Sequence, residues 1–297
     1  YYNIKFDKII IALAIDTDQF LKKGGRMAKL VLAAGVPHPP RLVREMQDAP
    51  GQLRGEALFK QVAGYFEAAA PDVIIELDSD HFVNFFYANV PAFCVGIAEE
   101  SEGPEEIWVP MPHYVVKGDV KMGKGLLGYG LKSNFDLAAA EELRLDHSMM
   151  VPLHFLNPNM EIPVIPLYVN GFAAPTPTAR RTFSLGRMVR KFVEQWEGDQ
   201  RVAILASGCF AMDVGGPLRG WTDDNWVGTV TDLIENGKYE TLARRATAQR
   251  MADAGNNSTE LLNWIGLTGA VGDTKPLFVE NDEGSGYAVW DLEGGRK

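Results

Sequence analysis

Two of the five histidines directly follow apolar segments that are typical of buried strands. His38 lies in AAGVPHPP after the apolar segment 29–33, and His81 lies in IIELDSDHF after the segment 73–77. Residues at the carboxyl ends of parallel strands gather at one edge of a sheet, where ligands bind. Two neutral imidazoles and one carboxylate hold iron(II) and leave coordination positions open for substrate and oxygen. The alternative is a packing or hydrogen-bonding role for both histidines, since their spacing alone is not a metal motif.

The elements that must position these side chains alternate along the chain. Short apolar segments predict strands, and amphipathic segments between them predict helices. This alternation indicates an α/β fold: a single large domain with a central, mainly parallel or mixed sheet flanked by helices on both faces. The predicted strands are 29–33, 73–77, 92–97, 164–169 and 202–206, and the predicted helices are 40–46, 57–70, 122–131, 178–196, 225–236 and 259–267.

Composition narrows the class of partner and the compartment. The 297 residues carry a net charge of −10, which argues against nucleic acid because no basic face would offset phosphate repulsion. Two cysteines cannot build a disulfide framework and suit a reducing cytoplasm. The apolar segment 9–15 is too short to span a bilayer, so we expect no membrane partner. Gly24-Gly25 predicts a boundary between an N-terminal accessory segment or extension, 1–26, and one domain, 27–297.

Six motifs in a fixed order resemble a known family. They are VPHPP, PDVIIELDSDHF, FCVGIAE, VKGD, LDHSMMVPL and GNNSTELLNWIGLTGA, and the resemblance that they carry extends from about Met27 to about Gly269. In this order the chain resembles the catalytic subunits of type II extradiol ring-cleavage dioxygenases, the class of protocatechuate 4,5-dioxygenase and gallate dioxygenase. The resemblance implies that 27–297 is a catalytic domain. It also implies a homodimer, or a complex with a small accessory subunit.

The resemblance implies a chemistry and a set of site residues. The iron(II) ligands of the family fall on His38, His81 and Glu260, and a family histidine near the substrate hydroxyls falls on His147. We expect Asp146 to fix the tautomer of the neighbouring His147. The implied reaction uses O2 to open the ring of a catecholic or related hydroxylated aromatic, beside its vicinal diol.

Further residues are expected to support or line this site. Glu260 opens a predicted helix, and Ser258 or Thr259 is expected to cap it. Tyr168 and Asn170 end another strand in PLYVNGF, where we expect them to line the substrate pocket.

One position departs from the family. The loop ASGCFAMDV carries Met212 where these dioxygenases have a histidine that transfers protons. A thioether neither accepts nor donates a proton at physiological pH. Either His147, His154, His113 or Asp213 acts instead, or the substrate needs no base there and Met212 forms part of a less polar substrate pocket. The third alternative is a different metal-dependent reaction, or a non-catalytic binding protein.

Overall fold

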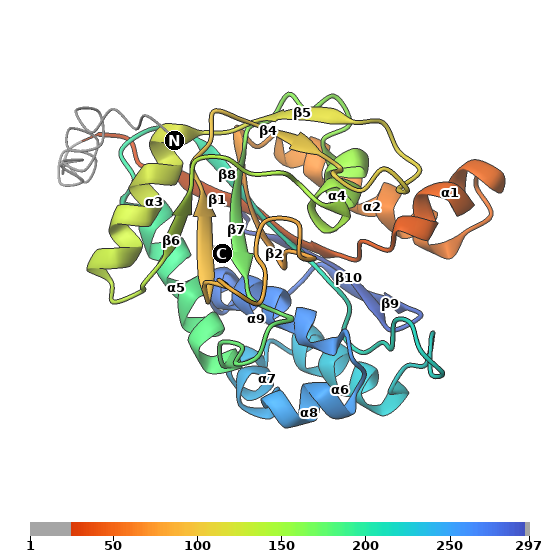
Figure 1. The fold of residues 1–297 in the computed structure, drawn as a ribbon. Helices are drawn as coiled ribbons and strands as arrows, with labels where there is room; N and C mark the ends of the chain where they lie inside the picture. Colours follow the sequence, from red (N-terminus) through yellow and green to blue (C-terminus); the bar gives the residue numbers. More distant parts are fainter. Residues whose placement is uncertain (1–24, 295–297) are drawn as a thin grey trace, which may run out of the picture.

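The computed structural model of the protein describes residues 25–294 (Figure 1). Eight strands in this part form one mixed sheet in the order β6-β3-β7-β2-β8-β1-β10-β9. A separate pair, β4 (Glu100–Gly103) and β5 (Tyr114–Lys117), forms a small antiparallel sheet. The strands of the large sheet are β1 (Lys29–Val36), β2 (Val73–Asp78), β3 (Phe93–Gly96), β6 (Ala138–Ala140), β7 (Val164–Val169), β8 (Arg201–Ser207), β9 (Phe278–Asp282) and β10 (Ser285–Asp291).

Four central strands run in one direction. β1, β8, β2 and β7 are parallel neighbours, whereas β3 pairs antiparallel with β7 and β10 pairs antiparallel with β1. Their residues are almost continuously buried, as expected for parallel strands covered on both faces. The carboxyl ends of these four strands therefore lie at the same edge of the sheet.

Helices cover both faces of the sheet (Figure 1). One layer contains α1, α2 and α4, which enclose one hydrophobic core, and α3, α5, α6, α7 and α9 enclose a second core on the opposite face. The helices are α1 (Pro40–Asp48), α2 (Arg54–Ala69), α3 (Val120–Lys132), α4 (His147–Leu156), α5 (Ala179–Gln195), α6 (Asp224–Glu235), α7 (Tyr239–Arg245), α8 (Ala248–Asp253) and α9 (Leu261–Val271).

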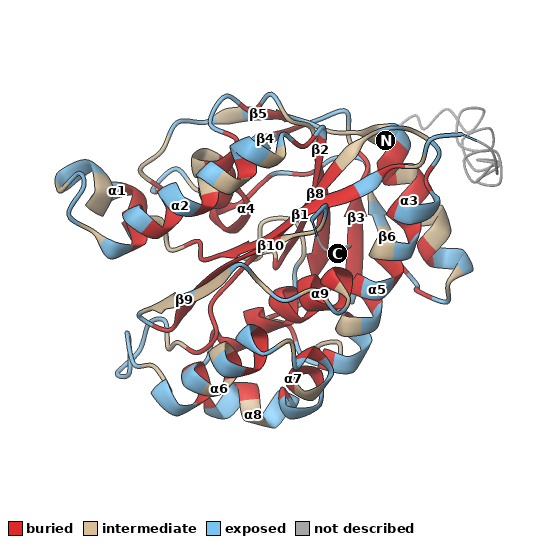
Figure 2. Cartoon of the chain, turned by 180° about the vertical axis from the view of Figure 1, so that it is seen from behind, coloured by how far each residue is buried: buried red, intermediate tan, exposed pale blue. Residues whose placement is uncertain are grey.

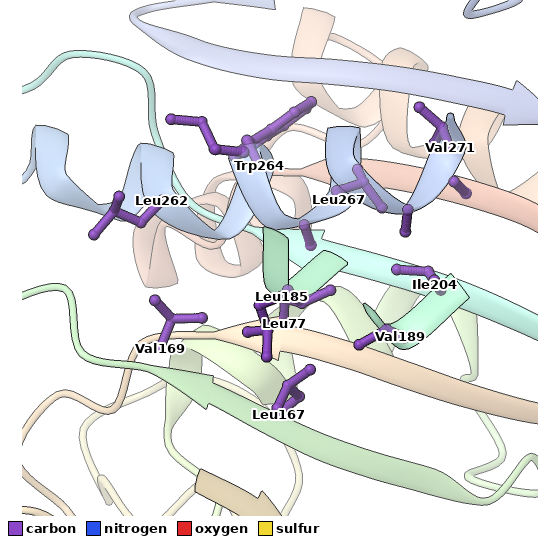
Figure 3. Close-up of a cluster of buried hydrophobic side chains, with 14 of the residues drawn as sticks. Leu77, Leu167, Val169, Leu185, Val189, Ile204, Leu262, Trp264, Leu267 and Val271 are labelled. Atoms are coloured by element: carbon purple, nitrogen blue, oxygen red, sulfur yellow. The ribbon is translucent and has the colours of Figure 1, made fainter. Parts of the chain in front are cut away.

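Every residue of α9 is buried, so this helix is a core element. Figure 3 shows Leu262, Trp264 and Leu267 of α9 among side chains of β2, β7, β8 and α5. The backbones of α9 and α5 approach closely: a Cβ atom added to Gly186 would lie 1.8 Å from the carbonyl oxygen of Gly266. Helix α9 is thereby held firmly between α5 and the sheet.

The predicted α/β class, with helices on both faces of a mixed sheet, is confirmed. Buried residues concentrate in the strands and on the inner helix faces, and exposed residues on the outer helix faces (Figure 2). Within residues 25–294, no helix has the length and apolarity to cross a bilayer. Most of the predicted segment 1–26 lies outside the described residues, so its accessory role stays a prediction.

Candidate metal centre

Three segments distant in sequence bring His38, His81 and Glu260 together. His38 follows β1 and His81 follows β2, and β8 lies between these two strands. Glu260 arrives from a 3₁₀ turn, Ser258–Glu260, that leads directly into α9. The Nε2 atom of His38 lies 3.1 Å from Oε1 of Glu260, and Nε2 of His81 lies 3.3 Å from the same oxygen.

A third imidazole completes the cluster. His147 is the first residue of α4, and its ring centroid lies 4.3 Å from that of His81 and 5.4 Å from that of His38. One ring nitrogen from each of the three histidines lies within 4.8 Å of the others, the arrangement of a set of metal ligands.

The donor set fits a metal ion. Oε1 of Glu260 is fully buried and faces the Nε2 atoms of His38 and His81 without a well-aligned hydrogen bond to either, which is costly for a carboxylate oxygen unless a cation faces it. Ligands at about 2.1 Å from a transition metal and at right angles to each other are about 3 Å apart. The separations from Oε1 to the two Nε2 atoms, 3.1 and 3.3 Å, match that spacing. His38, His81 and Glu260 therefore fit adjacent positions around one metal.

Each of these histidines is oriented through its other ring nitrogen. Nδ1 of His38 lies 2.6 Å from Oγ of Ser207, the last residue of β8. Oδ2 of Asp146 accepts the backbone N–H of His81 at 2.7 Å and lies 3.1 Å from its Nδ1. With both Nδ1 atoms engaged, the Nε2 atoms are left to bind a metal.

The electrostatics of the cluster favour a cation at its centre. Burial alone would raise the pKa of Glu260, but the imidazoles of His38 and His81 outweigh it and hold that pKa well below its usual value. Burial opposes the charged form of His81, yet Asp146 and Glu260 raise its pKa well above the ordinary value. Burial would also raise the pKa of Asp146, but its hydrogen bond to His81 and the charge of His81 lower that pKa below its usual value. Metal binding would release the proton that His81 holds between these carboxylates.

The loop after β8 holds Glu260 in place. The backbone N–H of Cys209 donates to Oε2 of Glu260 at 3.1 Å. Gly208, at φ +143°, allows this approach, because a Cβ there would lie 2.8 Å from the Cβ of Glu260. The N–H of Met212 donates to the hydroxyl of Ser258 at 3.2 Å. Neither Ser258 nor Thr259 makes the predicted cap; that prediction is wrong, because the Ser258 hydroxyl bonds the β8 loop instead.

The partner of His147 is Glu106, not Asp146. Oε1 of Glu106 lies 2.6 Å from Nδ1 of His147, and Oε2 accepts its backbone N–H at 3.0 Å. The prediction that Asp146 fixes the His147 tautomer is wrong, because Asp146 precedes α4 and its carboxylate is committed to His81 and Ser148. Adjacent residues at a helix start point in different directions. Sequence reasoning missed Glu106, which lies 41 residues away, and no local signal identifies it.

The other two predicted catalytic residues, His154 and Asp213, make contacts with residues outside this cluster. His154 is near the end of α4, and its Nδ1 lies 2.7 Å from the hydroxyl of Tyr114. The carboxylate of Asp213 accepts the N–H of Asn256 at 3.4 Å. The structure therefore brings His147 to the cluster and gives His154 and Asp213 other partners.

The predicted substrate residues Tyr168 and Asn170 line a small cavity together with Phe172. The Asn170 side chain accepts the N–H of Ala173 at 2.9 Å and donates to its carbonyl, which shapes the loop after β7. The Tyr168 hydroxyl is buried without a hydrogen-bond partner. Phe172 connects this cavity to the cluster, since its ring centroid lies 4.7 Å from that of His81.

Two buried carboxyl groups of β2 were also missed. Glu76 and Asp78 are fully buried; both carboxyl oxygens of Glu76 and one of Asp78 lack a hydrogen-bond partner. Burial, followed by the charge of Asp146, raises the pKa of Asp78 well above its usual value, and burial with Asp78 and Asp146 does the same for Glu76. These shifts favour the neutral form of both acids beside the Asp146–His81 pair.

These features define the class: an α/β protein with a buried set of metal ligands at the carboxyl edge of its parallel strands. Residues 32–286 match the family described as the catalytic LigB subunit of aromatic ring-opening dioxygenase. The chain belongs to this family.

Named relatives and one solved structure are similar to the chain. A 2,3-dihydroxyphenylpropionate/2,3-dihydroxicinnamic acid 1,2-dioxygenase of Photorhabdus laumondii is 34% identical over 168 residues, 55% of this chain and 50% of the relative. A protein of the same name from Escherichia coli is 31% identical over 147 residues, 48% of this chain and 43% of the relative. These matches span about half the length of the curated relatives. An uncharacterized protein from Escherichia coli K12 shares the fold, with a TM-score of 0.58 at 14% identity over 88% of this chain and 99% of that chain.

Proposed function

We propose that the protein is a non-haem iron(II) dioxygenase that opens the ring of a catecholic or related hydroxylated aromatic with O2. The observation that carries this proposal is the convergence of His38 and His81 on the buried Oε1 of Glu260. Membership of the family and the names of the relatives support it. The relatives are named for 2,3-dihydroxyphenylpropionate, so this diol is the first substrate to test.

His38, His81 and Glu260 would hold the iron, because two imidazoles and one carboxylate leave open positions on the metal. Oε1 of Glu260 lies 3.1 and 3.3 Å from the two Nε2 atoms, so we assign Glu260 as the third ligand. We assign His147, the remaining imidazole of the cluster, to the substrate. Iron(II) bound there supplies Lewis acidity toward the diol and the electrons that activate oxygen.

We assign proton transfer to His147. With Nδ1 held by Glu106, Nε2 is the nitrogen available to accept a proton from a substrate hydroxyl. Burial lowers the pKa of His147 despite the Glu106 hydrogen bond, so the ring is neutral near pH 7. After the transfer, the Glu106 carboxylate stabilises the imidazolium. His147 and Glu106 would thus supply the proton transfer that the thioether of Met212 cannot.

Aromatic side chains flank the cluster and suit a flat substrate. Phe172 lies against His81, and the Trp108 ring centroid lies 5.7 Å from that of His147. Such walls bind an aromatic ring and limit the access of water to it. We propose Tyr168, Asn170 and Met212 as further substrate-contacting residues, the first two through the cavity beside Phe172.

The test combines metal analysis with oxygen uptake. The protein is loaded anaerobically with iron(II), and uptake is measured with 2,3-dihydroxyphenylpropionate, protocatechuate and catechol. Glu260→Gln should lose stoichiometric iron. His147→Gln should keep iron and lose about 10²–10⁴-fold in rate, the usual contribution of general acid–base catalysis. Glu235→Gln, an exposed change on α6, controls for the loss of a charge.

Two results would contradict the proposal. Iron bound without uptake on any diol would favour a different metal-dependent reaction, the alternative to which Met212 points. Absence of stoichiometric iron would favour a non-catalytic binding protein. Full activity of His147→Gln would overturn the proton-transfer assignment alone, and Asp213 or His154 would then be tested by the same substitution strategy.

We further propose that the enzyme works in the cytoplasm as a homodimer or with a small accessory subunit. Both cysteines, Cys94 and Cys209, are free and buried, which suits a reducing compartment. Residues 1–26 are proposed as an accessory segment to the domain 27–297. Light scattering of the full chain and of a variant starting at Met27 tests the assembly and the boundary together.

A further inference from the structure

A basic groove lies at the end of α9 remote from the candidate metal centre. It is bordered by α5, α7 and the segment that follows α9, and its volume is about 920 Å³. Helix α9 spans 11 residues, so its two ends are about 16 Å apart. The cationic side chains that line the groove are Arg187, Arg190, Lys191, Lys238, Arg244 and Lys275.

The charge of this groove is opposite to that of the molecule. Six cations face three carboxylates, those of Glu194, Glu240 and Asp273, whereas the whole chain carries a net charge of −10. Random placement of 29 basic among 39 acidic residues would give an acidic lining. The groove therefore concentrates positive charge on an acidic protein.

Few of these cations are neutralised by the protein itself. Arg190 is committed, because its Nε donates to Glu194 at 2.8 Å and its Nη1 to the carbonyl of Ala270 at 3.1 Å. Arg187 has a single carboxylate partner, Glu240, at 3.9 Å.

The lysines of the groove have fewer protein partners than Arg187 and Arg190. Within residues 25–294, the ammonium groups of Lys191, Lys238 and Lys275 make no hydrogen bond or ion pair. These three lysines and Arg187 have charge available for a ligand.

The walls of the groove are fixed by buried contacts. The buried Tyr239 donates its hydroxyl to the carbonyl of Thr274 at 2.7 Å and accepts the indole N–H of Trp290 at 2.8 Å. This ties the segment after α9 to the start of α7. Gly272, at φ +66°, makes room for Arg190, since a Cβ there would lie 2.7 Å from its Nη1. The half-buried Phe183 adds an apolar surface to the lining.

We propose that this groove binds a small organic anion that carries two or more phosphate or carboxylate groups. Arginine and lysine side chains on several walls match a compact, multiply charged ligand, because charge-assisted hydrogen bonds converge on it. The acidic remainder of the surface repels a long polyanion such as nucleic acid. The site is separate from the metal centre, and the proposal does not depend on the proposed dioxygenase activity.

Titration calorimetry on the full chain tests this, with inorganic tripolyphosphate and citrate as probes at low ionic strength. The groove variant is Arg187→Gln/Lys191→Gln/Lys275→Gln. The control, Arg44→Gln/Arg180→Gln/Arg245→Gln, removes the same charge from exposed positions outside the groove on α1, α5 and α7. Circular dichroism and thermal unfolding verify that both variants fold.

The expected result is saturable binding of at least one probe with one site per chain. The groove variant should weaken it about tenfold or more, since charge-assisted hydrogen bonds from three side chains are lost. The control variant should change it by about twofold or less, the effect of general charge. Binding of tripolyphosphate alone identifies a phosphate site, and binding of citrate alone a polycarboxylate site. Failure of both probes to bind, or equal weakening in the two variants, overturns the proposal.

Discussion

Substitution of Asp146 by Asn should weaken metal binding although Asp146 touches no metal. Its Oδ2 accepts the backbone N–H of His81 at 2.7 Å and lies 3.1 Å from the ring nitrogen Nδ1 of the same residue. Its Oδ1 accepts the hydroxyl of Ser148 at 2.5 Å, and the residue is fully buried. Asparagine retains the shape but loses the charge that orients the imidazole and increases its basicity.

The magnitude follows from these contacts. Hydrogen bonds to a charged group contribute about 1.5–3 kcal/mol, more than neutral ones. Loss of a partner of this kind typically costs 10–100-fold in metal affinity, or about 1.4–2.7 kcal/mol. We expect Asp146→Asn to fall in that range.

Competition with a chelator of known affinity under anaerobic conditions measures the change. Asp119→Asn is the matched control: Asp119 caps α3 by accepting the N–H of Met122, and asparagine caps equally well. An Asp146→Asn affinity within about twofold of the wild type would refute the role of Asp146 in orienting a metal ligand.

Three further predictions concern a buried acid, helix packing and Met212. Burial raises the pKa of Glu76 well above its unfolded value of 4.5, so the folded state favours the neutral acid. Glu76→Gln should therefore gain stability relative to the wild type as pH rises above 4.5, by about 1.4 kcal/mol per pH unit until the folded-state pKa is passed. Urea unfolding at several pH values checks this, with the exposed change Glu67→Gln on α2 as the control variant. Gly186→Ala should destabilise the folded protein by about 1–3 kcal/mol or more, because the added Cβ meets a carbonyl oxygen of α9. Gly64→Ala in α2 is the control: its Cβ would have nothing within 4 Å, so it should stabilise the protein by about 0.5–1 kcal/mol. Equal changes of the two variants in thermal unfolding would contradict the packing argument. If a proton-transfer group is missing at position 212, Met212→His should raise the ring-cleavage rate on catechol at least about tenfold. Unchanged oxygen uptake would show that His147 already supplies the proton transfer.

Much of the fold could be predicted because its signals are local. Mostly apolar segments such as 73–77 predicted the parallel strands. Polar caps are local as well: Asp223 caps α6 by accepting the N–H of Trp226. The hairpin of β9 and β10 was missed, although the turn at Glu283 and Gly284, both with positive φ, carries a glycine between two alternating segments. Its place beside β1 depends on long-range pairing that no local pattern encodes.

The sequence by itself determined the fold class and the position of His38 and His81 at the ends of strands, because a strand and its end are both recognised from a few consecutive residues. Only the tertiary structure decided which groups act on one another. It paired Asp146 with His81 and Glu106 with His147, across 65 and 41 residues, because helix α4 directs adjacent side chains to different neighbours. It also brought the β8 loop against Glu260 through Cys209 and Ser258, since the strand order sets β8 between the two histidine-bearing strands. Such contacts depend on the path of the whole chain, and local residue patterns contain no record of them.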